Sequence, residues 1–258
     1  MTLPVFLGHE ATPALDTLRV GDSVELGGDE GRHAAKVRRM QVGERLDLVN
    51  GRGLRVRGVV DTLGGAALTL RVEAVTSEVP PAPTLILVQA LAKGGRDEQA
   101  VESATEIGVD RVLPWQANRS IVKWVGSKAE RARAKWVALT EAAAKQSRRA
   151  WVPVVESAAD SKALARWVEQ LVAGGGVCFV CHEEGSDTLT DYLRDNAQVG
   201  EATSIAVVIG PEGGIDEGEL AALREAGAAV VLLGPHVLRS SSAGAAALTL
   251  VSAATGRW

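Results

Sequence analysis

The chain has 258 residues, of which 46% are hydrophobic and 23% are charged, so it can bury a sizeable core as one large or two modest domains. It contains no run of eighteen apolar residues and no amino-terminal signal sequence, so we expect a cytoplasmic protein without a membrane span. Its two cysteines suit a reducing compartment and exclude a disulfide scaffold.

The net charge of −4 conceals two basic segments. Residues 32–57 carry eight Lys or Arg against two acidic residues, and residues 119–149 carry nine against two. Basic segments on an otherwise acidic chain favour a specific anionic partner such as a nucleic acid. For the second segment, a merely solvated basic helix face remains the alternative.

The first part of the chain has the pattern of a small antiparallel β-barrel. We expect strands at residues 23–26, 45–49, 54–60 and 67–72, with glycine-containing turns between the later ones and one helix at about 31–40. Prolines at positions 80, 81 and 83 then indicate an extended linker. We therefore expect a barrel domain over residues 1–76, a linker over 77–83 and a second domain over 84–258.

The second part alternates strands and helices, which predicts a parallel sheet with helices on both faces. We expect strands at 84–91, 109–113, 152–155, 177–181, 205–209 and 230–233, and helices at 96–107, 129–147, 161–172, 217–226 and 242–255. Asp216 and Glu219 form a capping-box pattern at the start of the 217–226 helix.

Two of these strands end in loops that predict a ligand site at the carboxyl edge of the sheet. Residues 210–214 read Gly-Pro-Glu-Gly-Gly, and the glycines let a ligand approach the backbone closely. The carboxylate of Glu212 disfavours a phosphate ligand and favours a cationic one, such as the sulfonium of S-adenosylmethionine. Residues 234–243 offer apolar walls for an adenine ring, together with hydroxyls. Arg239 in this loop could orient Glu212, neutralise an RNA phosphate or simply lie on the surface.

Several familiar motifs are absent or rejected. The chain has no P-loop, no dinucleotide fingerprint and no Gly-x-Ser-x-Gly elbow. Residues 178–182 read Cys-Phe-Val-Cys-His, the pattern of covalent haem attachment, but they lie in a hydrophobic strand where small thiols are packing residues. We expect no metal site.

Residues 32–39, 89–96, 104–109, 118–123 and 141–149, with the two glycine loops, form a series of blocks along most of the chain. In this order they resemble the RsmE-type ribosomal RNA uridine N3-methyltransferases of the SPOUT class. The resemblance implies a PUA-like RNA-binding barrel, an α/β SPOUT domain with a carboxyl-terminal trefoil knot, and a homodimer. It also implies S-adenosyl-L-methionine-dependent methylation of N3 of a uridine in 16S ribosomal RNA, either free or in the small ribosomal subunit.

The loops and the resemblance together predict three sets of site residues. We expect the cofactor to be bound by His182, Ile209, Gly210, Pro211, Glu212, Gly213, Gly214, Leu233, Gly234, Val237, Leu238, Ser240 and Ala243. We expect catalytic or base-positioning roles for Arg119, Gln146, Arg149, Glu212 and Arg239. We expect RNA contacts, mainly to phosphates, from Arg32, Lys36, Arg38, Arg39, Arg52, Arg55, Arg57 and Lys93.

The second glycine loop departs from the family pattern. Ser240-Ser241-Ser242 stands where the family has Thr-Glu-Thr, so no role of that carboxylate carries over to Ser241. Two other functions stay open: a noncatalytic RNA-binding or ribosome-assembly factor, and a SPOUT enzyme that methylates ribose or another base. The intact glycine loops argue against the first, and the block at 146–149 argues against the second.

Overall fold

The computed structural model describes residues 3–258, which form two compact units. The first unit runs to Pro80 and takes in Ala144–Val152, and the second comprises Pro81–Ala143 and Pro153–Trp258. The segment Ala144–Val152 therefore belongs to the first unit, although it falls inside the second domain expected from the sequence. The domain limits at 76, 77–83 and 84 remain a prediction.

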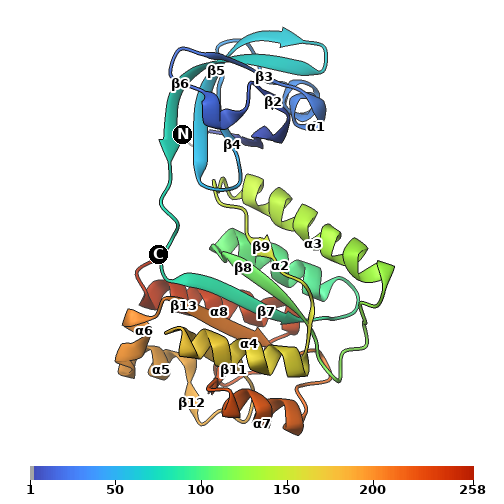
Figure 1. Cartoon of the computed structure of the whole chain (residues 1–258), viewed down its shortest axis with the longest axis vertical. Coiled ribbons are helices and arrows are strands. Elements are labelled where there is room, and N and C mark those ends of the chain that lie inside the picture. Colours follow the sequence, from blue (N-terminus) through green and yellow to red (C-terminus); the bar gives the residue numbers. More distant parts are fainter. Residues whose placement is uncertain (1–2) are drawn as a thin grey trace. The chain divides into compact units, whose positions relative to one another are not determined.

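The first unit is built on a curled six-stranded sheet, drawn in blue to cyan in Figure 1. The strand order is β1-β4-β5-β6-β3-β2, and every neighbouring pair is antiparallel except β1 and β4, which are parallel. The strands are β1 Val5–Leu7, β2 Ala11–Thr12, β3 Ser23–Leu26, β4 Arg45–Val49, β5 Leu54–Gly64 and β6 Ala67–Ser77. Two short 3-10 turns, η1 Gly8–Glu10 and η2 Leu15–Thr17, connect the first of them.

The helix of this unit lies earlier in the chain than the predicted 31–40. It comprises α1, Gly28–Arg32, and a π-helical turn η3, His33–Val37. It ends early because Arg39 adopts a left-handed conformation with φ of 53°. Gly31 lets the helix approach the sheet closely, since a Cβ atom there would lie 2.2 Å from the carbonyl oxygen of Leu26.

The segment Ala144–Val152 is attached to the first unit by several contacts. Lys145 forms an ion pair with Glu30, and a guanidinium nitrogen of Arg55 donates to the carbonyl of Arg148 at 3.0 Å. Arg52 and Trp151 form an isolated antiparallel bridge. These contacts join residues far apart in sequence, which is why the local pattern alone does not reveal them.

The second unit contains a parallel sheet, as predicted, but with eight strands among the described residues instead of the six expected, because the two-residue strands β10 and β12 are too short to show a pattern. The order is β10-β8-β7-β13-β11-β14-β12, and β9 pairs with β8. The strands are β7 Thr84–Ala90, β8 Arg111–Gln116, β9 Val154–Val155, β10 Ala159–Asp160, β11 Val177–Cys181, β12 Asp187–Thr188, β13 Ser204–Ile209 and β14 Ala229–Leu232.

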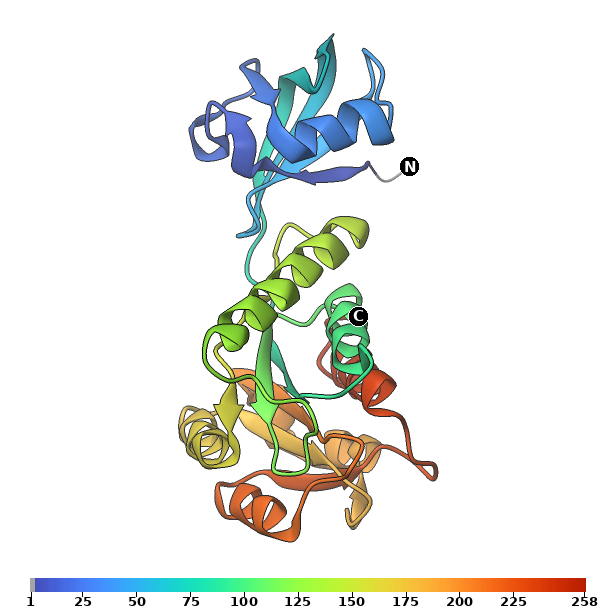
Figure 2. The ribbon, with the colours of Figure 1, turned by 90° about the vertical axis from the view of Figure 1, so that its right-hand side faces the viewer.

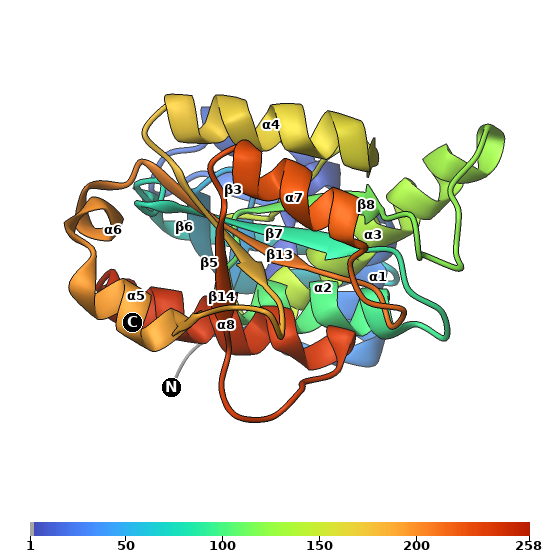
Figure 3. The ribbon, with the colours of Figure 1, turned by 90° about the horizontal axis from the view of Figure 1, so that it is seen from below.

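Helices cover both faces of this sheet, as Figure 3 shows. Helices α4 and α7 pack on one face, and α2, α3, α5 and α8 pack on the other. Helices α2 and α8 are distant in sequence but lie side by side (Figures 2 and 3). The bounds are α2 Arg96–Ile107, α3 Ser127–Gln146, α4 Ser161–Ala173, α5 Leu189–Asp195, α6 Ala197–Glu201, α7 Glu217–Glu225 and α8 Ser240–Ala254.

Strand register brings the ends of four strands to the same level at the carboxyl edge of this sheet. Ile209 of β13 lies opposite both Gln89 of β7 and Cys181 of β11, and Cys181 lies opposite Val231 of β14. Because parallel strands all point the same way, the loops that follow β7, β11, β13 and β14 emerge at one edge. This edge is where the sequence predicts the ligand site.

Candidate functional site

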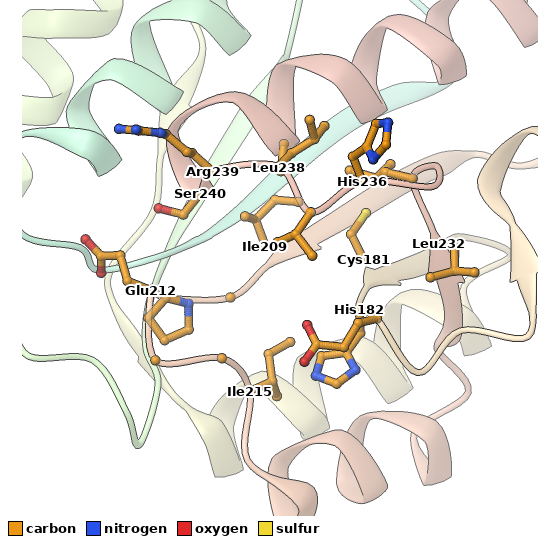
Figure 4. A pocket seen from close by; sticks show the side chains of 18 of the residues that line it. Cys181, His182, Ile209, Glu212, Ile215, Leu232, His236, Leu238, Arg239 and Ser240 are labelled. Carbon is orange, nitrogen blue, oxygen red and sulfur yellow. The ribbon is translucent and has the colours of Figure 1, made fainter.

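A pocket of about 840 Å³ lies at this edge of the second unit (Figure 4). Its walls come mainly from the loops after β11, β13 and β14 and from the start of α8. A cavity of this volume is of the size that holds a cofactor. Figure 4 shows Ile209 near the middle of the pocket, Glu212 at its left side, and His182 below Cys181.

The structure brings the residues of the predicted cofactor set together. Every one of them lines the pocket: His182, Ile209, Gly210, Pro211, Glu212, Gly213, Gly214, Leu233, Gly234, Val237, Leu238, Ser240 and Ala243. Arg119, Glu212 and Arg239 of the predicted catalytic set line it as well. Gln146 and Arg149 are not among the residues that line it, and they lie in the segment that belongs to the first unit. What each residue binds remains a prediction.

Sequence reasoning missed several residues of the pocket wall. They are Arg96, Cys181, Glu183, Ile215, Leu232, Pro235 and His236. Most are direct neighbours of predicted residues in the same loops. Arg96 is different, because it starts α2 and reaches the pocket from the loop after β7. The adjacency of β7 and β13 places that loop beside the first glycine loop.

Glu212 is held by Arg96. The Nη1 atom of Arg96 lies 2.8 Å from Oε1 of Glu212. Partial burial raises the pKa of Glu212, but its own backbone amide, the Arg96 guanidinium and the Lys93 amide outweigh that effect, so the pKa lies below its ordinary value. The ion pair with Arg96 orients Glu212, and the role of Arg239 remains a prediction.

Arg119 packs directly against the first glycine loop. Its Nη1 atom donates to the carbonyl of Gly213 at 3.2 Å. A Cβ atom at Gly213 would lie 3.1 Å from Cβ of Arg119 and 3.3 Å from its carbonyl oxygen. A side chain at position 213 would therefore push the first glycine loop away from the loop after β8, which carries Arg119. This close approach explains why position 213 is glycine.

The second glycine loop ends in the first turn of α8. This helix starts at Ser240, two residues before the predicted start, with Arg239 at its N-cap. The hydroxyl oxygen of Ser240 is buried in the pocket wall without a hydrogen-bond partner among the described residues. A buried hydroxyl normally has a partner, so this orphaned atom fits a polar group of a bound molecule. Val237 is 86% exposed and Leu238 42%, which leaves apolar surface at the mouth of the pocket.

Comparison with known proteins gives the family. Residues 80–252 match the family described as the RNA methyltransferase domain, and residues 26–73 match the RNA methyltransferase PUA domain. Proteins named ribosomal RNA small subunit methyltransferase E are similar over nearly the whole chain. The one from Mycobacterium tuberculosis is 43% identical over 245 residues, covering 95% of this chain and 92% of that protein. The one from Bacillus subtilis is 28% identical, covering 87% and 88%. The chain belongs to the ribosomal RNA small subunit methyltransferase E family.

Solved structures agree with this family in fold. A protein from Legionella pneumophila, solved in complex with the bound cofactor SAM, is 26% identical with a TM-score of 0.81 and 98% coverage of both chains. A ribosomal RNA small subunit methyltransferase E from Neisseria gonorrhoeae has the same TM-score and coverage at 22% identity, which shows the fold alone. The predicted PUA-like domain and SPOUT-type α/β domain are thus confirmed, while the trefoil knot remains a prediction.

The predicted RNA-binding cations of the first unit include two that bind a buried carboxylate and four that are unpaired within residues 3–258. Arg55 and Arg57 both form ion pairs with Asp47, which is 4% exposed, at 3.2 and 2.9 Å. Arg55 also pairs with Glu78 at 2.6 Å. These two arginines neutralise a buried carboxylate, so a phosphate would have to compete with it. Four other cations of the set are exposed and make no ion pair among the described residues: Lys36, Arg38, Arg39 and Arg52.

The two remaining residues of the predicted RNA-binding set are Arg32 and Lys93. Arg32 forms an exposed ion pair with Asp29 at 2.9 Å, and Lys93 is exposed in the loop after β7.

Over residues 3–258, no group of three or more His, Cys, Asp or Glu side chains could hold a metal ion. Nor does any helix in this part of the chain have the length and apolar character needed to cross a membrane.

We predict that both thiols of this family member are inert in the folded state. Burial raises the pKa of Cys178 and of Cys181 to about 12. At about pH 8 only on the order of one thiol in ten thousand would then be ionised, and the thiolate is the reactive form. A chromogenic disulfide reagent should therefore label both cysteines slowly in the native protein and rapidly in guanidinium chloride. Rapid labelling of the native protein at about pH 8 would contradict the raised pKa of these thiols.

Proposed function

We propose that this protein is an S-adenosyl-L-methionine-dependent methyltransferase that acts on N3 of a uridine in 16S ribosomal RNA. The observation that carries this proposal is the pocket lined by both glycine loops, in a chain that is 43% identical to a ribosomal RNA small subunit methyltransferase E. The SAM complex of the Legionella pneumophila protein, which has the same fold, supports the choice of cofactor.

The residues of the pocket fit this cofactor. Ile209, Leu233 and Leu238 supply apolar surface for the adenine ring, and the orphaned hydroxyl of Ser240 supplies a polar partner. Glu212 supplies negative charge that would favour the positively charged sulfonium of the cofactor. When bound, the cofactor contributes a methyl group that the positive sulfur has already activated for displacement.

The protein's own groups then have to orient the base and stabilise charge. Uracil N3 must lose its proton before or during attack, which places negative charge on the ring. Arg119 is the cation best placed to stabilise that charge, because it lines the pocket and is fixed against Gly213. The lowered pKa of Glu212 makes it a weak proton acceptor, so we assign it an electrostatic role toward the sulfonium.

The RNA itself would be held mainly through its phosphates. Exposed cations of the first unit, among them Lys36, Arg38, Arg39 and Arg52, supply the sequence-independent part of the affinity. We further propose that Gln146 and Arg149 help to position the base, that the protein acts as a homodimer, and that it works in the cytoplasm on free ribosomal RNA or on the small subunit.

Product identification tests the proposed function. Unmodified 16S ribosomal RNA and unmodified small subunits are incubated separately with the protein and a donor labelled in its methyl group. The RNA is digested to nucleosides, which are identified by mass spectrometry, and reactions without protein serve as controls. We expect labelled 3-methyluridine from at least one substrate. Absence of label would favour a noncatalytic RNA-binding factor, and label on ribose or another base would favour a different SPOUT activity.

A further inference from the structure

A buried carboxylate outside the pocket connects two loops of the second unit. Glu219 on α7 is 3% exposed. Its Oε1 atom accepts hydrogen bonds from the backbone amide of Asn118 at 2.7 Å and from the hydroxyl of Ser161. Its Oε2 atom accepts from the backbone amide of Asp216 at 3.2 Å, which completes the capping box. Helix capping alone would use only the bond to Asp216, so the bonds to Asn118 and Ser161 require another explanation.

The side chain of Asn118 is held by the same turn of α7. Its Nδ2 atom donates to Oδ2 of Asp216 at 2.6 Å. The other carboxylate oxygen of Asp216 accepts from the amide of Glu219 at 2.8 Å. The hydrogen bond from Asn118 also keeps the pKa of Asp216 below its ordinary value. Asn118 is thus held at two points, its backbone and its side chain, by the turn that directly follows the first glycine loop.

Arg119 is the next residue in the chain. With Asn118 held, the backbone of Arg119 lies against Gly213, and its guanidinium donates to the carbonyl of Gly213. The hydrogen bonds of Glu219 and Asp216 therefore set the distance between the loop after β8 and the first glycine loop. The acceptors are carboxylate oxygens, and hydrogen bonds to a carboxylate are stronger and shorter than bonds between neutral groups.

We propose that Glu219 is a positioning residue for the methyl transfer, because through Asn118 it places Arg119 over the first glycine loop. The inference rests on the proposed function, which gives Arg119 its role toward the reacting base. Glu219 does not line the pocket, so it acts only through Asn118 and Arg119. A displacement of about 1 Å at a catalytic group can lower a rate by about 100-fold.

Three variants test this proposal: Glu219→Gln, Asn118→Ala and, as a matched control, Glu217→Ala. Glu217 is an exposed acidic residue in the same turn of α7. Turnover is measured with labelled donor and 16S ribosomal RNA, and donor affinity is measured by calorimetry. We expect kcat to fall by about 10- to 100-fold in both network variants, with the dissociation constant of the donor changing less than about threefold. The control should match the wild type in both.

Combination with Arg119→Ala separates positioning from a general structural role. If this network acts through Arg119, neither Glu219→Gln nor Asn118→Ala should lower kcat further when Arg119 is already alanine. Independent, multiplicative losses would overturn the proposal, as would unchanged kcat or a loss of donor affinity beyond tenfold in Glu219→Gln. Asn118 is exposed, so its substitution keeps the test available if Glu219→Gln fails to fold. A wild-type protein that forms no methylated uridine would instead refute the proposed function.

Discussion

Replacement of Arg119 by alanine should lower kcat by about 100-fold or more, while the affinity for the methyl donor changes by less than about threefold. The reason is that Arg119 is the cation proposed to stabilise the uracil anion, a charge that develops only during the reaction. Its guanidinium is fixed by Gly213 at 3.2 Å, so little reorganisation is needed when the charge appears. Single-turnover rates and calorimetry of the donor measure the two quantities separately.

A matched control for Arg119→Ala is Arg131→Ala. Arg131 is an exposed arginine on α3 that does not line the pocket, so its removal changes the net charge equally. We expect at most a small loss of RNA affinity from the control, reduced at higher salt. Equal effects of the two substitutions on kcat would show that Arg119 acts by general attraction of RNA rather than at the reacting base.

Replacement of Arg257 by alanine, near the carboxyl terminus, should lower the stability of the folded protein substantially. Arg257 forms a two-pronged ion pair with Asp110, and the two side chains are only 9% and 15% exposed. It also donates to the carbonyls of Pro83 at 2.8 Å and Gly108 at 2.9 Å. Removing the arginine takes the guanidinium partner from the largely buried Asp110 and leaves it the backbone amide of Leu85 at 2.8 Å, which should lower the free energy of unfolding by about 3 kcal/mol. Chemical denaturation measures this difference.

The exposed pair of Arg194 and Asp191 provides the comparison. These side chains are 68% and 49% exposed and lie 2.9 Å apart on α5. Arg194→Ala should change the free energy of unfolding by less than about 0.5 kcal/mol, because water screens exposed pairs. Similar losses from the two substitutions would mean that Arg257 does not hold the end of the chain to the sheet.

The sequence pattern predicted the strands and helix ends that depend on residues close together in the chain. Hydrophobic strands such as 205–209 and the capping box at Asp216 were located correctly, because strand burial and helix capping depend on neighbouring residues. Helices α5 and α6 were missed, since they are short and their sequence lacks a long apolar period. The attachment of Ala144–Val152 to the first unit depends on tertiary contacts and could not be read from the pattern.

The same distinction holds for the site. The glycine loops were predicted because strand ends rich in glycine are informative by themselves. The role of Glu219 was recognised only as a helix cap, because its partner Asn118 lies 101 residues away. Arg96 was missed for a similar reason, since it meets Glu212 only when β7 and β13 pair. The pairing of Arg57 with Asp47 could have been found from the β4–β5 hairpin, where the two residues face each other.

A crystal structure of the protein grown with S-adenosylmethionine tests the central claim most directly. The account predicts that the methyl donor lies between residues 209–214 and 233–240, in contact with both glycine loops and with the hydroxyl of Ser240. A donor bound elsewhere, or a pocket closed by its own side chains at saturating donor, would contradict it.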